Sequence, residues 1–215
     1  MRSLHETIVL PIEDGKKWYV AKNLFKGVWL FLLSPVATWA LINILFYEQQ
    51  DLWQLQILGV LYAAVDVAAL LYEKRIKLSI TTTVHHTVVM IFAQLIPFID
   101  YNSPQHALWK GLVIYASWST LTFIVNIYLG ARFLLTKRGR SELRLQHLLA
   151  IVARDVYFYS LVANCICQIV NISYSPLNYT SAVYIFLILF IVNDDIVLYK
   201  FLSSEVFRIR KMFGK

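Results

Sequence analysis

Long uninterrupted apolar runs constrain the fold of this chain more than any other feature of its sequence. A helix needs roughly 20 apolar residues to cross a hydrocarbon layer about 30 Å thick. Backbone polar groups in lipid must be hydrogen-bonded within their own segment, so such runs predict helices, and the short alternating strands of a barrel are absent. Six runs have the required length: Phe25–Tyr47, Leu52–Tyr72, Leu78–Ile99, Leu108–Leu135, Leu145–Val170 and Thr180–Leu202. The fourth is long enough to tilt, kink or extend past the membrane.

The composition supports this interpretation, because 59% of the residues are hydrophobic and only 15% are charged. A soluble domain is typically about half apolar and a quarter charged. The sequence therefore predicts an all-α membrane protein, with six transmembrane helices in a bundle or barrel. Residues 1–24 form a polar N-terminal segment with a candidate interfacial helix at its end, residues 25–202 form the six-span domain, and residues 203–215 form a basic tail.

The net charge of +7 is distributed in an alternating pattern along the chain. Lys and Arg occur in the N-terminal segment, in the second and fourth loops and at the C-terminal end. They are absent from the three intervening loops, which are Glu48–Asp51, Asp100–His106 and Asn171–Tyr179. This is the positive-inside pattern, and it predicts both termini on the same, basic side of the membrane. The basic residues are thus interpreted as topology signals and lipid contacts, and no nucleic-acid partner is expected.

Ionisable side chains inside a span are costly and mark a functional site by default. When depth is counted from the basic side at about 1.5 Å per residue, most of these groups lie roughly 9–12 Å inside the membrane. Arg132 lies at a shallower depth, and Asn126 is about as deep as the main group. The sequence therefore predicts an inner polar pocket that is reached from the basic side. Its candidate residues are Asp66, His85, His86, Asn126, Arg132, Arg154, Asp194 and Asp195.

Helical periodicity places further polar residues on the same inner faces. The fourth run carries such residues at three- and four-residue spacing, and the fifth run carries a second set. These two sets are Tyr115, Ser119, Thr122, Asn126 and Gly130, and then Arg154, Tyr157, Asn164 and Gln168. A structural alternative stays open, in which Arg154 pairs with Asp194 or Asp195 only to fix the packing of helices.

The adjacent histidines His85 and His86 are the sharpest local feature. Neighbouring residues on a helix diverge by about 100°, so one imidazole is expected to face the pocket and the other to contact a neighbouring group. A pocket histidine can act as a general base toward a hydroxyl or an amine. No metal site is expected, because a metal ion would need further ligands and a bis-histidine haem would need a second histidine at matching depth. Cys165 and Cys167 are expected to remain unpaired, since their side chains point in different directions.

Several of these residues together resemble the TLC-domain family, which includes ceramide synthases and translocon-associated membrane proteins. The resemblance covers the chain from its first span to its C-terminus. It rests on Asp66 followed by Leu70-Leu71, on the His85-His86 pair, and on the hydroxyl-rich stretch Ser117–Arg132 with its Asn and Arg. Asn193 in the last span is also similar to the family pattern.

The resemblance carries expectations about the site. In ceramide synthases the paired histidines belong to the active site, which joins an acyl chain from acyl-CoA to a sphingoid amine. His85 and His86, with Asp66, are therefore expected to be catalytic, whereas the remaining polar candidates are expected to bind lipid. The second motif of those enzymes, a His-Asp pair with further acidic residues, has no counterpart in the fourth run. The chain thus looks like a member of the family that is not a ceramide synthase.

Two functional hypotheses follow from these observations. In the first, the protein binds or handles an acyl chain, a sphingolipid or a phospholipid, with acyltransferase-like chemistry, acyl-CoA as a co-substrate and no other cofactor. In the second, it is a non-catalytic accessory or scaffold subunit of a larger membrane complex. The resemblance favours the endoplasmic reticulum with cytosolic termini, and the charge pattern equally suits a mitochondrial inner membrane with termini in the matrix.

Overall fold

The computed structural model describes residues 14–47, 51–71, 80–135, 140–176 and 179–213, and the regular structure in these ranges is entirely helical. Each predicted apolar run falls on a helix, or on a pair of helices in the case of the fourth run. The all-α prediction is therefore confirmed. The elements are α2 (Asp14–Phe46), α3 (Leu52–Leu71), α5 (Ile80–Leu95), η1 (Ile96–Phe98), η2 (Pro104–Trp109), α6 (Lys110–Leu121), α7 (Phe123–Leu135), α8 (Arg140–Ser173) and α9 (Tyr179–Phe213).

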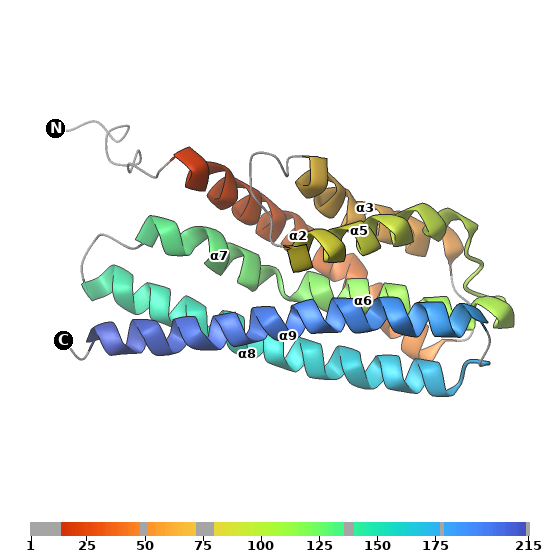
Figure 1. Ribbon diagram of the computed structural model, residues 1–215. Helices are drawn as coiled ribbons and strands as arrows, with labels where there is room; N and C mark the ends of the chain where they lie inside the picture. Colours follow the sequence, from red (N-terminus) through yellow and green to blue (C-terminus); the bar gives the residue numbers. More distant parts are fainter. Residues whose placement is uncertain (1–13, 48–50, 72–79, 136–139, 177–178, 214–215) are drawn as a thin grey trace.

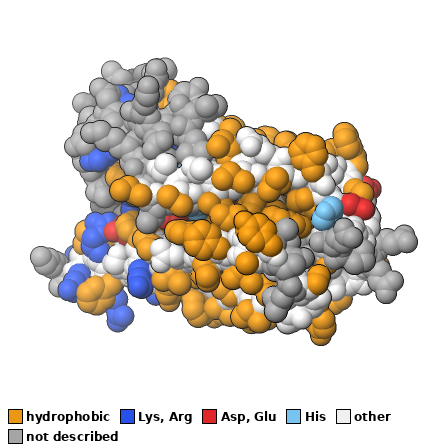
Figure 2. Space-filling view, turned by 45° about the vertical axis from the view of Figure 1, so that its right-hand side comes forward, with side chains coloured by type: hydrophobic (Ala, Val, Ile, Leu, Met, Phe, Trp, Pro, Cys, Tyr) orange, Lys and Arg blue, Asp and Glu red, His pale blue; other side chains and the backbone are white. Residues whose placement is uncertain are grey.

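The helices form one elongated bundle, in which α2 packs against α6 and α7, and α8 packs against α6, α7 and α9 (Figure 1). Helix α3 packs mainly against α5. The beginnings of α2 and α8 lie at the same end of the bundle as the ends of α7 and α9 (Figure 1). Lys and Arg side chains gather toward that end, whereas hydrophobic side chains cover the middle of the visible surface (Figure 2). We call this the basic end of the molecule.

Three helices in the described ranges are long and apolar enough to cross a membrane, namely Lys16–Phe46, Arg140–Ser173 and Ser181–Phe213. The bent pair α6–α7 adds a fourth when it is counted as one span. The apolar helices in the second and third runs are shorter, Leu52–Ala68 and Thr82–Phe98. These lengths indicate an integral membrane protein.

Helix α2 continues through Pro35, a residue that usually kinks or ends a helix. Proline has no N–H, so the Phe31 carbonyl loses its normal helical donor. The Ser34 hydroxyl donates to this carbonyl at 2.8 Å instead. A side chain thus satisfies the freed backbone group, as is required within a membrane.

The fourth apolar run breaks at Thr122, where α6 and α7 meet with a bend of 41°. Thr122 has φ −87° and ψ 19°, which lies outside the helical region. Two hydroxyls cap carbonyls beside the break: Thr120 donates to Ser117 at 2.6 Å, and Thr122 donates to Ser119 at 2.7 Å. The kink considered for this run is therefore present.

Both ends of the described chain are more helical than the predicted segments suggest. Residues 16–26 form the first turns of α2 rather than a separate interfacial helix, and residues 203–213 continue α9. These polar turns stay helical because their inner faces pack against the bundle. Residues 1–13 lie outside the described part. Cys165 and Cys167 on α8 are both free, as expected.

Candidate functional site

A cavity of about 440 Å³ lies among the helices toward the basic end, a volume within the range of small-molecule sites. It borders both parts of the hydrophobic core, since Leu30 and Val125 line it from different clusters. Six of the eight predicted site residues line this cavity: His85, His86, Asn126, Arg132, Asp194 and Asp195. Its other polar lining residues are Tyr19, Lys22, Asn23, Lys26, Tyr62, Thr82, Tyr115, Ser119, Thr122 and Tyr157.

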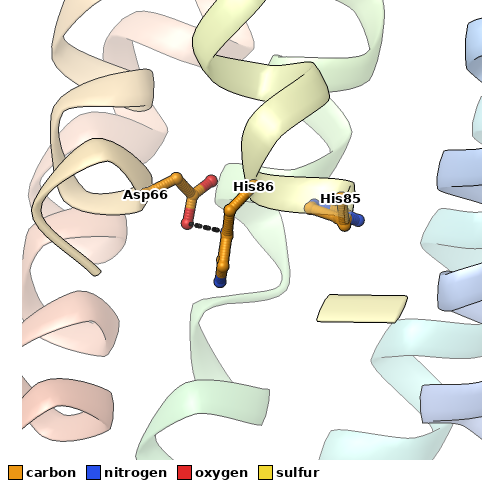
Figure 3. A group of neighbouring side chains, drawn as sticks. All are labelled: Asp66, His85 and His86. Atoms are coloured by element: carbon orange, nitrogen blue, oxygen red, sulfur yellow. Dashed lines mark ion pairs between the residues drawn. The ribbon is translucent and has the colours of Figure 1, made fainter. Parts of the chain in front are cut away.

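Asp66 of α3 is fully buried behind the cavity wall and does not line the cavity itself. Its Oδ1 accepts a hydrogen bond from Lys26 Nζ of α2. The same oxygen lies 3.1 Å from His86 Nδ1 of α5, and the two side chains face each other (Figure 3). Asp66 thus holds two cavity residues in place from behind, which makes it a positioning residue.

His85 points away from the Asp66–His86 pair (Figure 3) and meets a carboxylate of another helix. Its Nδ1 lies 3.2 Å from Asp194 Oδ2 of α9. The two imidazole rings are 5.5 Å apart and nearly perpendicular. Both histidines nevertheless line the cavity, whereas only one was expected to do so. The two side chains diverge as expected for neighbouring residues on a helix, but each imidazole contacts a carboxylate on its own side of α5.

The adjacent aspartates of α9 also have different partners. Asp194 contacts His85, whereas Asp195 accepts a 2.7 Å hydrogen bond from the Tyr157 hydroxyl of α8. Asp195 is nearly buried, and Tyr62 and Tyr115 line the same region. This part of the cavity is therefore rich in carboxylates and phenol hydroxyls.

The wall nearest the basic end carries cations. Arg132 of α7 lies 3.5 Å from both Glu205 Oε2 and the Tyr19 hydroxyl. Its guanidinium also lies over the rings of Phe133 and Phe201, at 4.7 Å and 4.8 Å. Lys22 lines the cavity, yet it forms no hydrogen bond or ion pair with any residue that the structure describes.

Arg154 is not brought to this cavity. Its Nε donates to Asp155 Oδ1 at 2.8 Å, and the pair is partly exposed. The pairing of Arg154 with Asp194 or Asp195 is therefore not the one that the structure contains. Asn164 and Gln168 of the same helix do face inward, but Gln168 Nε2 donates to Asn164 Oδ1 and to the Gly111 carbonyl.

A second, smaller cavity of about 30 Å³ adjoins the first, and Tyr62 and Tyr115 line both. Its other lining residues are almost entirely aliphatic or aromatic, and they come from α3, α5, η1, α6, α9 and the turn at Tyr101. Gly59 lies against Ile96 here, where an added Cβ would be 2.5 Å from Ile96 Cδ1. The site thus changes from polar to apolar beyond the two tyrosines.

Donor atoms of Asp66, His85 and His86 lie within 4.8 Å of one another, a spacing compatible with metal ligands. However, Lys26 already neutralises Asp66 and would repel a cation at that carboxylate. His85 is directed toward Asp194 instead. We therefore interpret the cluster as two histidine–carboxylate pairs rather than as a metal centre.

Sequence reasoning missed the lysines of this site and Glu205. Lys22 and Lys26 lie at the basic-side end of the first span. The positive-inside pattern already explains a lysine at that position. The available signal is the spacing of Tyr19, Lys22, Lys26 and Leu30, which follows one face of a helix. That signal is visible only if the helix begins well before the apolar run.

Each histidine–carboxylate pair is suited to moving a proton. A carboxylate beside Nδ1 favours the tautomer with the proton on Nδ1, which leaves Nε2 free to accept one. A hydroxyl or amine bound in the cavity is the natural donor of that proton.

Comparisons with protein-family models, curated proteins and solved structures find no match for this chain.

Proposed function

We propose that this chain is a six-span membrane protein that binds and handles a lipid in its polar cavity. The observation that carries the proposal is the cavity of about 440 Å³ that both histidine–carboxylate pairs reach. The resemblance to the TLC-domain family supports the same conclusion. By that resemblance, the membrane is the endoplasmic reticulum and both termini lie in the cytosol.

The six-span arrangement is supported by helix length and charge. Helix α3 has 20 residues and is therefore about 30 Å long, which matches the hydrocarbon thickness. Helix α5 has 16 residues and is extended by η1. The alternation of basic and non-basic loops supports one crossing by each of the six helices.

A lipid fits the cavity better than a fully polar ligand does. Apolar side chains line the polar cavity beside its charged groups, so it suits an amphiphile. They are Leu30, Val125, Leu129, Val197, Leu198 and Phe201. Val197 lines the cavity and is 49% exposed. An apolar side chain therefore borders the cavity at the outer surface of α9, where the membrane would lie. A lipid can therefore reach the polar groups without leaving the bilayer.

The reaction class that the histidines would serve is acyl transfer. The resemblance points to acyl-CoA as the acyl donor. His86 Nε2, or His85 Nε2, would accept the proton of a lipid hydroxyl or amine as that group attacks the acyl carbon. The thioester C–S bond would then break, and the imidazolium would return the proton to the departing CoA thiolate. Asp66 and Asp194 would keep the imidazoles oriented, and Asn126 and Arg132 would contact the lipid headgroup.

Native mass spectrometry of the chain, gently extracted from its own membrane, tests this proposal. One lipid or acyl-CoA per 25.0 kDa chain is expected.

A transfer assay with a fluorescent acyl-CoA tests the role of the histidine. His86→Ala should slow any transfer by a factor of roughly 10² or more, because it removes a general base. His147→Ala is the matched control, since His147 contacts Phe213 and does not line the cavity.

The contrary result is recovery of the chain, free of lipid, only inside a large multi-subunit particle. If His86→Ala also assembles normally there, the accessory-subunit function replaces lipid handling. Undiminished transfer by His86→Ala would remove the catalytic role of that residue and leave lipid binding to be judged by mass alone.

A further inference from the structure

We infer that the basic mouth of the cavity, lined by Tyr19, Lys22 and Arg132, binds the phosphate group of a phospholipid. This inference rests on the proposed lipid-binding function and names its ligand class. It is carried by the charges that the cavity contains, by the geometry of Arg132, and by the depth at which both cations lie.

Among the described residues that line the cavity, Lys22 is a cation that forms no ion pair. Lys26 is engaged by Asp66, and the two aspartates that line the cavity contact His85 and Tyr157. Lys22 is only partly exposed and lines the cavity, yet it has no carboxylate within ion-pair distance among the described residues. A half-buried ammonium at a membrane boundary is stabilised when a ligand supplies the opposite charge.

Arg132 is oriented for such a ligand. The rings of Phe133 and Phe201 hold its guanidinium plane, and the Tyr19 hydroxyl lies 3.5 Å from one terminal nitrogen. A guanidinium has five N–H donors, so it can keep these contacts and bind a phosphate as well. Tyr19 and Lys22 lie three residues apart on one face of α2, which brings the lysine to the same region of the wall.

The depth of the two residues matches that of phospholipid phosphates. Lys22 precedes the start of the first apolar run at Phe25 by three residues, and Arg132 precedes the end of the fourth run at Leu135 by three. At about 1.5 Å per residue, both lie within roughly 5 Å of the predicted membrane boundary. A phospholipid can therefore place its phosphate here while its chains stay in the bilayer.

The test compares two lipids that differ only in the phosphate, dioleoylphosphatidic acid and dioleoylglycerol. Each is titrated onto the delipidated full chain in neutral detergent, and bound lipid is counted by native mass spectrometry. Wild-type protein should prefer phosphatidic acid. Lys22→Gln and Arg132→Gln should each weaken its binding roughly tenfold, the usual effect of losing a charge-assisted hydrogen bond. Lys200→Gln is the control, because Lys200 is exposed on α9 and does not line the cavity.

Equal binding of the two lipids, or unchanged binding of phosphatidic acid in the Lys22→Gln/Arg132→Gln double variant, would overturn the phosphate site and leave the lipid function standing. Binding of neither lipid would count against both. Displacement of phosphatidic acid by millimolar inorganic phosphate would show a site for free phosphate instead of a phospholipid. If Arg132→Gln does not fold, Lys22→Gln decides the outcome, with Arg132→Lys as the charge-conserving comparison.

Discussion

At the scale of single residues, the buried ion pair between Lys26 and Asp66 ties three helices together. Asp66 is 0% exposed and Lys26 is 15% exposed, and the carboxylate also contacts His86. Replacing both charges of such a pair is often harmless, whereas removing one leaves the other charge buried and unpaired. The two residues should therefore depend on each other.

Asp66→Asn should lower the free energy of unfolding by about 3–5 kcal/mol, because it leaves the Lys26 ammonium without a counter-charge. Lys26→Met should act similarly on the carboxylate. The double variant should lose clearly less than the sum of the two, since neither charge then remains. Unfolding in mixed detergent micelles measures all three variants against wild type.

Asp155→Asn provides the control, because the Arg154–Asp155 pair is 31% and 45% exposed. Its loss should cost about 0–1 kcal/mol, as is usual for exposed pairs. Additive effects of Asp66→Asn and Lys26→Met would show that the ion pair is not a coupled unit.

The sequence predicts the acids and histidines of the site better than its lysines. A carboxylate or imidazole deep in an apolar run has few explanations other than a site, which is why Asp66, His85 and His86 were found. Lys22 and Lys26 can also be explained as positive-inside signals that fix the topology, so they do not by themselves indicate a site. Arg154 was misleading although depth and helical periodicity both placed it with Tyr157, because Asp155 beside it offers a closer partner.

At the scale of elements, apolar runs fix where helices lie but not where they break. Pro35 is the usual signal for a break, yet the Ser34 hydroxyl serves the freed carbonyl and α2 continues. The break that does occur is at Thr122, next to neither glycine nor proline. Hydroxyl bonds to nearby carbonyls act in both places, with opposite results, so the sequence alone does not distinguish them.

A buried polar network joins α6, α8 and α9 at the end of the bundle opposite the cavity mouth. Gln168 Nε2 donates to the Gly111 carbonyl at 2.8 Å, and the Tyr184 hydroxyl donates to Gln168 Oε1 at 2.7 Å. A Cβ at Gly111 would collide with the Tyr184 hydroxyl and lie 2.6 Å from Gln168 Oε1. Glycine at this position lets the three helices meet.

Gly111→Ala should therefore lower the free energy of unfolding by about 2–3 kcal/mol, because the new methyl group separates buried hydrogen-bonding partners. Gly130→Ala is the matched comparison. Its Cβ would lie 2.7 Å from Leu24 Cγ and 3.2 Å from the Val20 carbonyl oxygen, so Leu24 would have to shift, but no hydrogen bond is disrupted. Alanine also favours a helix interior by about 1 kcal/mol. Thermal unfolding in detergent should rank Gly111→Ala well below Gly130→Ala. Similar losses for both would mean that the network does not hold the three helices.

At the scale of the whole molecule, chemistry is concentrated near one end. The cavity, both histidine–carboxylate pairs and the cations of its wall lie toward the basic end, whereas the apolar cavity and the Gln168 network lie farther along the bundle. A membrane is compatible with this polarity, because charged groups are costly at its centre and are tolerated toward its interfaces. The number of crossings decides which groups share that interface.

Labelling of single cysteines in sealed vesicles tests the six-span topology, in a background where Cys165 and Cys167 are serine. If all six helices cross, a membrane-impermeant thiol reagent should label cysteines at Lys17, Ile80, Ser141 and Met212 from the basic side, and at Asp51 and Ser173 from the other. All six positions are exposed, so each is accessible when it lies outside the membrane. Ile80 is decisive, because it lies at the start of α5. Labelling there from neither side, while Lys17 is labelled, would mean that α3 and α5 form a hairpin that does not cross, and the chain would then have four spans.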